Sequence, residues 1–243
     1  MAGVFITGTD TGVGKTLVTV ALGLALREAG IDVGVMKPVE TGAPLTGGRR
    51  VGDDAALLHR LLAPEDSIED VNPFALALPA APAVAARQAG VTIDLARIRE
   101  AYARLCGRHE IVLVEGAGGL LVPLDAKTTM ADLALALGCP LIVVARKRLG
   151  TINHTLLTLR EAGRLGCRVL GVVLNEWDGS GEALSEADAL NLEALRERLP
   201  VPVLAELPPL KLGASDRWTA AALAPILASF EGSAVEILKA TIG

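Results

Sequence analysis

The sequence predicts an α/β fold in which helices cover both faces of a parallel sheet, and three observations lead to it. The 243 residues are 51% hydrophobic and 21% charged, which allows a large core and excludes a disordered chain. Short β-branched runs alternate with longer segments rich in Ala and Leu, the order typical of βα units. The short runs are apolar at successive positions, as strands buried on both faces are.

The predicted strands and helices follow one another in a regular order. Strands are predicted at Val4–Thr7, Val33–Met36, Ile111–Val114, Leu141–Ala145, Val169–Leu174 and Val203–Leu204. Helices are predicted at Lys15–Ala29, Asp54–Leu62, Leu95–Cys106, Met130–Leu137, Thr151–Leu165, Glu186–Leu199 and Trp218–Phe230. Four of these helices are followed by a glycine suited to a C-terminal cap, namely Gly30, Gly107, Gly138 and Gly166.

Three stretches lie outside these elements. Residues 42–52 are loop-like, residues 64–82 are rich in Pro and Ala and are predicted to be irregular, and the tail from Ser233 fits no single pattern. No stretch has the composition of a linker between two folding units. We therefore expect a single domain over residues 1–243.

Composition excludes several classes of function. The net charge is −5, and the one dense basic run is 146–148, so neither a nucleic acid nor an anionic membrane is expected as a partner. The longest uncharged apolar stretch, 133–145, is interrupted by Gly138 and Pro140 and is too short to span a bilayer. The three cysteines are scattered and the N-terminus has no basic segment before its apolar run, so we expect a reducing, cytoplasmic location.

The sharpest motif is GTDTGVGKT at residues 8–16, which follows a predicted strand and opens a predicted helix. Glycines let the backbone curl so that its N–H groups point at phosphate oxygens, and the helix N-terminus adds partial positive charge. Lys15 supplies a full charge to the terminal phosphates, and the Thr16 hydroxyl is placed for Mg²⁺. Thr9 occupies the usual place of the first glycine, so the loop is one residue longer than the standard form. The alternative is a glycine-rich turn with a chance Gly-Lys-Thr.

Three charged residues are expected near this loop. Glu115 ends an apolar strand before a glycine-rich turn and suits a Mg²⁺ ligand, although a solvated strand-end glutamate is the alternative. Lys37 ends the second strand, and a snorkelling surface lysine is its alternative. Asp54 begins a helix, where local sequence alone favours simple capping. Since parallel strands end at one edge of a sheet, Lys37 and Glu115 should face the same crevice.

Taken together, five segments resemble the dethiobiotin synthetase family over nearly the whole chain: GTDTGVGKT at 8–16, KPVETG at 37–42, DDAALL at 53–58, VEGAGG at 114–119 and LGTINHTLLT at 149–158. The resemblance implies a homodimer with a P-loop fold and a parallel sheet of about seven strands. It implies a ligase of biotin biosynthesis whose substrates are 7,8-diaminononanoate, CO₂ or bicarbonate, and Mg-ATP. One amine becomes a carbamate that attacks the γ-phosphate, and the other amine then closes the ureido ring.

The resemblance also implies roles for individual residues. Lys15, Lys37 and Thr11 would act at the reacting groups, with Lys15 and Lys37 flanking the γ-phosphate and the carbamate. Thr16, Asp54 and Glu115 would hold Mg²⁺. The nucleotide would be bound by Gly12, Val13, Gly14, Lys15, Thr16, Leu17, Asp54, Glu115, Gly116, Ala117, Gly118, Asn175, Glu176, Leu207, Pro208 and Pro209. The diamine would be bound by Thr41, and its far carboxylate, across the dimer interface, by Gly150, Thr151 and Asn153.

One departure and three alternatives accompany this resemblance. Some members present a tyrosine to the substrate carboxylate from the helix at 186–199, which here has no tyrosine and offers only Asn191. The segment at 150–153 also fits an ordinary helix start. A partition-type ATPase switch would carry a lysine early in the phosphate loop, where this chain has Thr9 and Asp10. An enzyme that amidates corrin rings would need a glutaminase domain, for which the chain has no room.

Overall fold

A six-stranded parallel sheet forms the centre of the protein. The structure, a computed structural model, describes residues 3–176, 184–210, 218–230 and 232–242. The strand order is β10–β9–β8–β1–β7–β2, and every pair in it is parallel. The strands are β1 (Gly3–Gly8), β2 (Val33–Met36), β7 (Ile111–Gly119), β8 (Leu141–Arg146), β9 (Val169–Asn175) and β10 (Val203–Leu207).

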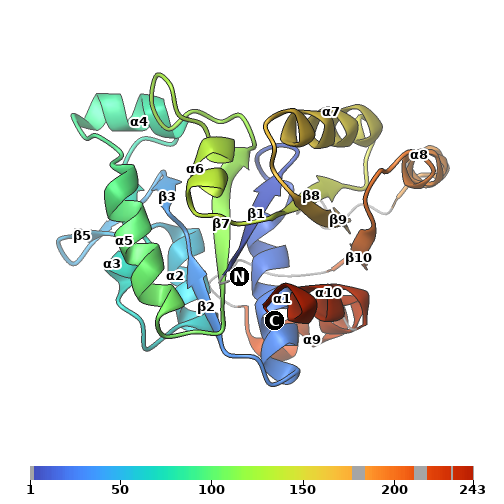
Figure 1. The fold of residues 1–243 in the computed structure, drawn as a ribbon, viewed down its shortest axis with the longest axis horizontal. Helices are drawn as coiled ribbons and strands as arrows, with labels where there is room; N and C mark the ends of the chain where they lie inside the picture. Colours follow the sequence, from blue (N-terminus) through green and yellow to red (C-terminus); the bar gives the residue numbers. More distant parts are fainter. Residues whose placement is uncertain (1–2, 177–183, 211–217, 231, 243) are drawn as a thin grey trace.

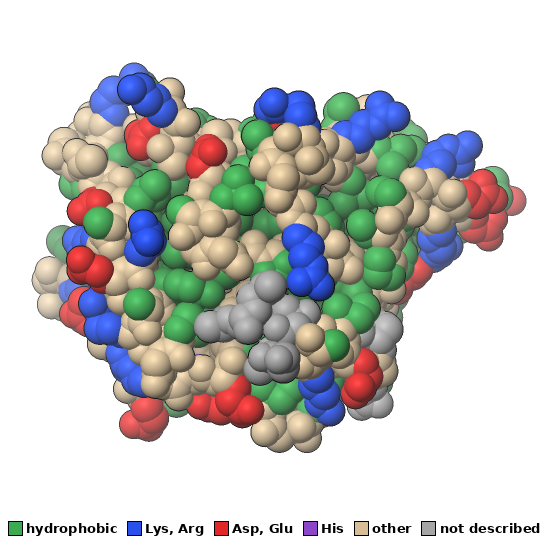
Figure 2. Space-filling view, in the orientation of Figure 1, with side chains coloured by type: hydrophobic (Ala, Val, Ile, Leu, Met, Phe, Trp, Pro, Cys, Tyr) green, Lys and Arg blue, Asp and Glu red, His purple; other side chains and the backbone are tan. Residues whose placement is uncertain are grey.

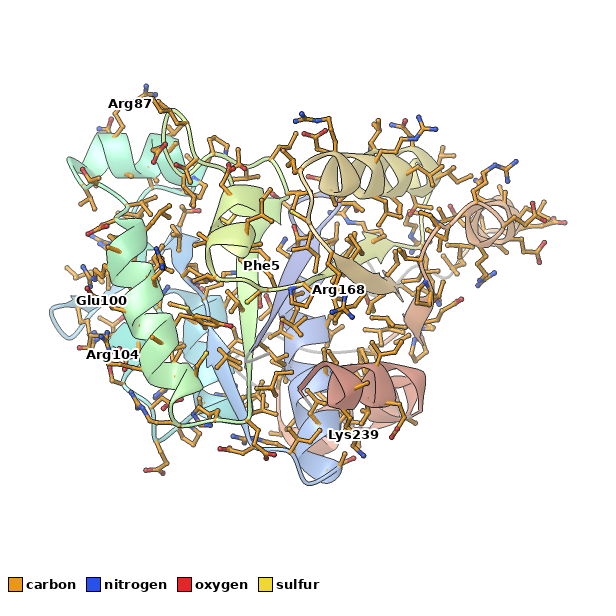
Figure 3. The ribbon with its side chains drawn as sticks, viewed as in Figure 1. Phe5, Arg87, Glu100, Arg104, Arg168 and Lys239 are labelled. Atoms are coloured by element: carbon orange, nitrogen blue, oxygen red, sulfur yellow. The ribbon has the colours of Figure 1, made fainter. Side chains whose placement is uncertain are left out.

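Helices cover both faces of this sheet because neighbouring strand residues point to opposite sides (Figure 1). Val4 and Ile6 pack into one apolar core, and Phe5 between them packs into the other. The first face carries α1 (Lys15–Glu28), α2 (Asp53–Leu62), α9 (Ala220–Leu227) and α10 (Ser233–Ile242). The second carries α5 (Leu95–Cys106), α6 (Met130–Ala136), α7 (Thr151–Arg164) and α8 (Glu186–Arg196). Figure 3 shows Phe5 in the interior, with Arg87, Glu100 and Lys239 on outer helices.

The six predicted strands and the helices between them are confirmed, with ends that shift by a few residues. The resemblance implied about seven strands in one sheet, and the described residues form six. After β2, Pro38 has no N–H to donate to the sheet, and the chain turns away. The next segment, β3 (Val39–Thr41), pairs instead with β6 (Phe74–Leu76) in a separate two-stranded parallel sheet.

The stretches expected to be irregular contain short elements. Residues 64–82 include α3 (Ile68–Val71), whose first turn is capped by Ser67, as well as β6, and Pro82 then starts α4 (Pro82–Ala89). The loop at 42–52 holds a hairpin of β4 (Leu45–Thr46) and β5 (Arg49–Arg50). Its two-residue turn uses Gly47 and Gly48 at φ 60° and 78°, the left-handed values that such turns require. Composition alone therefore did not predict these short elements, which depend on local caps and turns.

The C-terminal segments complete the first face of the sheet. The helix predicted over 218–230 begins later, at Ala220, because Thr219 caps it, and a 3-10 turn, Ala228–Phe230, follows α9.

Among the described residues, no single helix is long and apolar enough to cross a membrane. One pair bent by 76°, Ala220–Phe230 with Ala234–Ala240, passes that test by length and composition only. On the face drawn in Figure 2, acidic and basic side chains are interspersed around the rim with apolar side chains between them.

Candidate active site

The register of the three adjacent strands β1, β7 and β2 brings the predicted charged residues together. Ile6 of β1 lies beside Glu115 of β7, and Met36 of β2 lies beside Val114. Lys37 follows Met36 directly and therefore emerges next to Glu115 at the carboxyl edge of the sheet. The phosphate loop leaves β1 at this same edge, as expected for a ligand site in a parallel sheet.

Glu115 is the most buried charged group of this site. It follows Val114, so it points to the opposite face of the sheet, where α1 begins. One carboxylate oxygen, Oε1, accepts a hydrogen bond from the Thr16 hydroxyl at 3.0 Å and pairs with the Lys37 ammonium. Within the described part of the chain, its other oxygen, Oε2, is buried with no hydrogen-bond partner. A buried acceptor of this kind is costly unless a ligand or water completes it.

Lys37 joins the two carboxylates of the site. Its ammonium lies 3.0 Å from Asp54 Oδ2 and also contacts Glu115. Burial opposes its charge, but Glu115 and Asp54 together raise the pKa of Lys37, so it stays protonated. Burial likewise opposes ionisation of Asp54, yet the Lys37 ammonium lowers the pKa of that carboxyl. Lys37 and Asp54 are therefore charged at neutral pH, whereas burial raises the pKa of the Glu115 carboxyl against the pull of Lys37.

The phosphate loop holds Lys15 beside this cluster. Gly12 and Gly14 adopt left-handed φ values of 68° and 90°, which turn the loop before α1 starts at Lys15. The Lys15 ammonium donates to the carbonyl oxygen of Asp10 at 3.2 Å. Burial and the neighbouring Lys37 lower the pKa of Lys15 to about 8. A phosphate anion bound in the loop would stabilise the protonated form of Lys15 and raise its pKa.

The oxygen atoms of Thr16, Asp54 and Glu115 fit a magnesium ion. Mg²⁺ prefers one or two carboxylates and completes its shell with phosphate oxygens and water. The unpartnered Oε2 of Glu115 offers a donor for which the described residues supply no other use. Among those residues, no group of three or more His, Cys, Asp or Glu is placed to hold a metal. The candidate metal position thus consists of two carboxylates and a hydroxyl.

Thr11, in the phosphate loop, lies against the glycine-rich end of β7. Its carbonyl oxygen accepts a hydrogen bond from Arg146 at 2.7 Å. A side chain at Gly118 would come within 3.3 Å of the Thr11 hydroxyl, and one at Gly116 would meet the Phe5 ring at 2.7 Å. The glycines of the VEGAGG segment therefore allow the two loops to approach each other, with Ala117 half-buried between them.

The residues expected near an adenine base lie side by side at the ends of β9 and β10. Asn175 is paired in register with Leu207, and its side-chain amide donates to the Val13 carbonyl of the phosphate loop at 2.9 Å. Glu176 lies 3.8 Å from the Lys147 ammonium, which is also 3.4 Å from Glu206. Leu207 is buried, Pro208 is half-buried and Pro209 is exposed. This group of residues thus adjoins the phosphate loop.

The residues expected to bind the diamine are not all in contact with the charged cluster. Thr41 ends β3 and is paired with Leu76. Thr151 is buried at the start of α7 and shares a cavity of about 100 Å³ with Thr9, Asp10, Val13, Arg146, Arg148, Leu149 and His154. Gly150 and Asn153 line a separate depression of about 470 Å³ together with Leu149, Ile152, Leu156, Leu157, Arg160 and Asn191. The start of α7 therefore borders two hollows.

Three residues of the site received no role from the sequence. Arg146 joins the phosphate loop through Thr11. Glu40 accepts hydrogen bonds from two backbone N–H groups at the start of α2, and burial raises its pKa to about 7. Asn72 donates to the Lys37 carbonyl at 2.7 Å. Glu40 stands inside the KPVETG segment and was visible there, whereas Asn72 lies in a stretch with no recognisable signal.

The fold and the site define a P-loop nucleotide-binding protein, and solved structures share its fold. MinD from Pyrococcus horikoshii, complexed with Mg-ADP, superposes with a TM-score of 0.53 at 19% identity and covers 98% of this chain and 96% of that one. McdA from Cyanthece gives a TM-score of 0.54 at 15% identity over the full length of both chains. These likenesses show the fold alone. A family model described as an AAA domain matches residues 2–215.

Sequence relatives define the family more narrowly. An ATP-dependent dethiobiotin synthetase of Anaeromyxobacter dehalogenans is 45% identical over 206 residues, which cover 84% of this chain and 90% of the relative. Synthetases of the same name from Aromatoleum aromaticum and Bacillus subtilis subsp. natto are 42% and 38% identical, over 84% and 86% of this chain and 89% and 88% of theirs. The chain belongs to the ATP-dependent dethiobiotin synthetase family.

Proposed function

We propose that this chain is a ligase that makes dethiobiotin from 7,8-diaminononanoate, CO₂ and ATP, with ADP and phosphate as the other products. The observation that carries the proposal is the pair of ammonium groups, Lys15 and Lys37, gathered with two carboxylates beside the phosphate loop. Membership of the synthetase family supports the same reaction. We propose further that the whole chain works as one domain in the cytoplasm.

The proposed reaction has three steps. One amine nitrogen of the substrate attacks CO₂ and loses a proton, which leaves a carbamate. A carbamate oxygen attacks the γ-phosphorus and expels ADP, giving a mixed anhydride. The second amine attacks the anhydride carbon and expels phosphate, which closes the ureido ring. The second step must bring two anions together, so fixed cations are its main physical requirement.

The site residues meet that requirement in distinct ways. Lys37 stays protonated and would lie between the carbamate and the γ-phosphate, where it offsets their repulsion. Lys15 and the backbone N–H groups of residues 12–17 would hold the triphosphate. Thr16, Asp54 and Glu115 would hold Mg²⁺, which supplies charge neutralisation on the phosphates when bound. Thr11 and Thr41 would contact the carbamate and the diamine.

We propose that the remaining binding sites lie at the two ends of the crevice. Asn175, Glu176 and residues 207–209 would receive the adenine base, because they adjoin the phosphate loop through the Asn175–Val13 hydrogen bond. The start of α7, at Gly150, Thr151 and Asn153, would bind the substrate carboxylate through its first turn, although the Thr151 N–H already donates to the Arg148 carbonyl oxygen at 3.1 Å. Thr151 is buried, whereas the depression at Gly150 and Asn153 is open to a second molecule.

We propose that the protein is a homodimer that completes this carboxylate site across its interface. Leu149 and Leu157, which line the depression at the start of α7, are 84% and 57% exposed. Exposed leucines gathered around one hollow are typical of a protein–protein interface. A twofold dimer would place the α7 start of one protomer near the charged cluster of the other.

A product assay tests the reaction directly. Purified protein with ATP, Mg²⁺, ¹³C-bicarbonate and the diamine should yield dethiobiotin heavier by one mass unit, with one ADP formed per product. Omitting the diamine should remove nearly all ADP formation. A partition-type switch would hydrolyse ATP without the diamine, and equal hydrolysis in both reactions would rule out the synthetase.

A mixing experiment tests the shared site. Lys37→Ala and Asn153→Ala proteins should each have low activity, because each lacks one half of every site. After exchange of subunits, a one-to-one mixture should recover about a quarter of wild-type activity, since half of the dimers then contain one intact site. Sedimentation measures the dimer independently. A mixture that gains no activity while exchanging subunits would show that each protomer carries a complete site.

A further inference from the structure

Helix α2 begins at a residue that cannot cap it. Its N-cap is Gly52, which has no side chain, although the first turn of a helix leaves backbone N–H groups without partners. Two of these groups, those of Asp54 and Ala55, donate instead to the carboxylate oxygens of Glu40, each at 2.9 Å. Glu40 belongs to β3 and is 8% exposed. The buried carboxylate of Glu40, from another element of the fold, therefore caps α2 in place of an N-cap side chain.

Gly52 is the residue that makes room for this arrangement. A Cβ atom at Gly52 would overlap the Glu40 carboxyl group at all three of its heavy atoms. The backbone of Gly52 has φ −73° and ψ 153°, a conformation open to any residue. Close approach of Glu40, and no special backbone angle, explains why glycine fits here.

Asn72 ties the same helix start to the lysine of the site. Its side-chain amide donates to the Lys37 carbonyl at 2.7 Å, and its side-chain oxygen lies 3.4 Å from the Gly52 nitrogen. The segment from Lys37 to Glu40 thus meets the start of α2 twice. Asp54, which pairs with Lys37, is the second residue of that helix.

We propose that Glu40 is a positioning residue, whose carboxylate fixes the first turn of α2 and thereby holds Asp54 toward Lys37 and the magnesium position. The inference rests on the role given to Asp54 in the proposed function. Glu40 itself accepts backbone N–H groups with both oxygens, so its contribution passes through Asp54. Groups that orient a metal ligand in this way commonly change metal affinity by about 10- to 100-fold.

Metal binding, measured without turnover, tests the proposal. Mn²⁺ in place of Mg²⁺ is titrated into the full-length protein with ADP, and the EPR signal of free Mn²⁺ reports the bound fraction. Glu40→Ala should weaken Mn²⁺ binding by about tenfold or more. Glu40→Gln keeps one acceptor oxygen and should fall between Glu40→Ala and the wild type. Mn²⁺ affinity that is unchanged in folded Glu40→Ala protein would overturn the proposal.

Two further variants serve as controls. Asp94→Ala tests whether any loss of stability weakens Mn²⁺ binding, and Asp54→Asn tests whether the proposed metal site exists. Asp94→Ala removes the N-cap of α5, where Asp94 accepts from Ala96 N–H at 2.8 Å, and no proposed site residue lies on that helix. It should lower thermal stability while leaving Mn²⁺ affinity unchanged, and an equal loss of affinity would overturn the role of Glu40. If Asp54→Asn binds Mn²⁺ normally, the proposed metal site itself fails, which is visible without any Glu40 variant.

The contact between Gly52 and Glu40 gives a final test, which depends on coupling between two substitutions. Gly52→Ala forces the Glu40 carboxyl away and should weaken Mn²⁺ binding about as much as Glu40→Ala does. In a Glu40→Ala background the overlap is gone, so adding Gly52→Ala should cost little more. Losses that multiply in the double variant would show that Gly52 and Glu40 act separately and would overturn the proposal.

Discussion

Two clusters of buried charge lie at opposite ends of the central sheet, and they differ in how fully their hydrogen bonds are satisfied. At the amino ends of β2 and β7, Asp70 accepts from Arg104 at 2.9 Å and from Arg108 at 2.7 Å. Asp66 accepts from Arg108 and faces the His109 ring, each at 2.9 Å. Both oxygens of each aspartate thus have a partner. Arg104 extends from α5 (Figure 3).

At the carboxyl ends of the same strands, the charges are less completely paired. Among the described residues, Glu115 has an oxygen without a partner, and the Lys15 ammonium donates to a single acceptor, the Asp10 carbonyl at 3.2 Å. A satisfied cluster holds helices and strands together, whereas an incomplete one has capacity left for a ligand. The difference indicates which buried charges serve stability and which serve function.

Lys37→Ala should have the largest effect on activity. Removing a cation from between two reacting anions should lower kcat by at least about a hundredfold with little change in KM. Steady-state ADP formation with saturating diamine and bicarbonate measures both constants. A thermal melt checks folding, since Glu115 loses its buried partner. A rise in KM with kcat unchanged would place Lys37 outside the reacting groups.

Asp70→Asn, in the satisfied cluster, should lower stability and leave activity unchanged. It removes charge from two hydrogen bonds to arginines and should cost about 2 kcal/mol of unfolding free energy. Because the protein has 243 residues, Tm should fall by about 4–8 °C. Denaturant unfolding measures the first quantity, and kcat at 25 °C should stay near the wild-type value. Lost activity in folded Asp70→Asn protein would contradict a purely stabilising role.

Glu115→Gln should act on metal dependence. The amide keeps the shape of the side chain but removes the negative charge that a magnesium ligand supplies. We expect the Mg²⁺ concentration for half-maximal ADP formation to rise by about tenfold. A Mg²⁺ titration at fixed ATP measures it, with Asp70→Asn as the matched loss of a buried carboxylate. Identical titration curves for Glu115→Gln and wild type would remove Glu115 from the metal ligands.

The incomplete cluster was largely predictable from sequence, and the satisfied one was not. Lys15, Lys37 and Glu115 each follow an apolar strand, and strands in a parallel sheet end at one edge. Asp66 and Asp70 lie in a Pro-rich stretch, and Arg108 is distant in sequence, so no spacing rule joins them. Glu40 was missed for a related reason, because a cap supplied from another element leaves no local pattern at the helix it caps.

The smallest expected effect is a change in ADP affinity with pH, which tests whether Lys15 of the incomplete cluster binds phosphate. The pKa of Lys15 is lowered to about 8 by burial and by Lys37, whereas the pKa of Lys37 is raised and that group stays charged. ADP without Mg²⁺ should bind the charged form of Lys15. Above about pH 8 the free protein loses a proton that the complex retains, so affinity should fall by up to tenfold per pH unit. Lys15→Met should bind ADP more weakly and with little dependence on pH over 7 to 9.5.

The stability of the unliganded wild type should show the opposite trend. Its free energy of unfolding should rise between about pH 8 and 10.5, since only the unfolded chain still holds the Lys15 proton there. ADP affinity that is constant across pH 8 would mean that the ammonium of Lys15 does not contribute to phosphate binding.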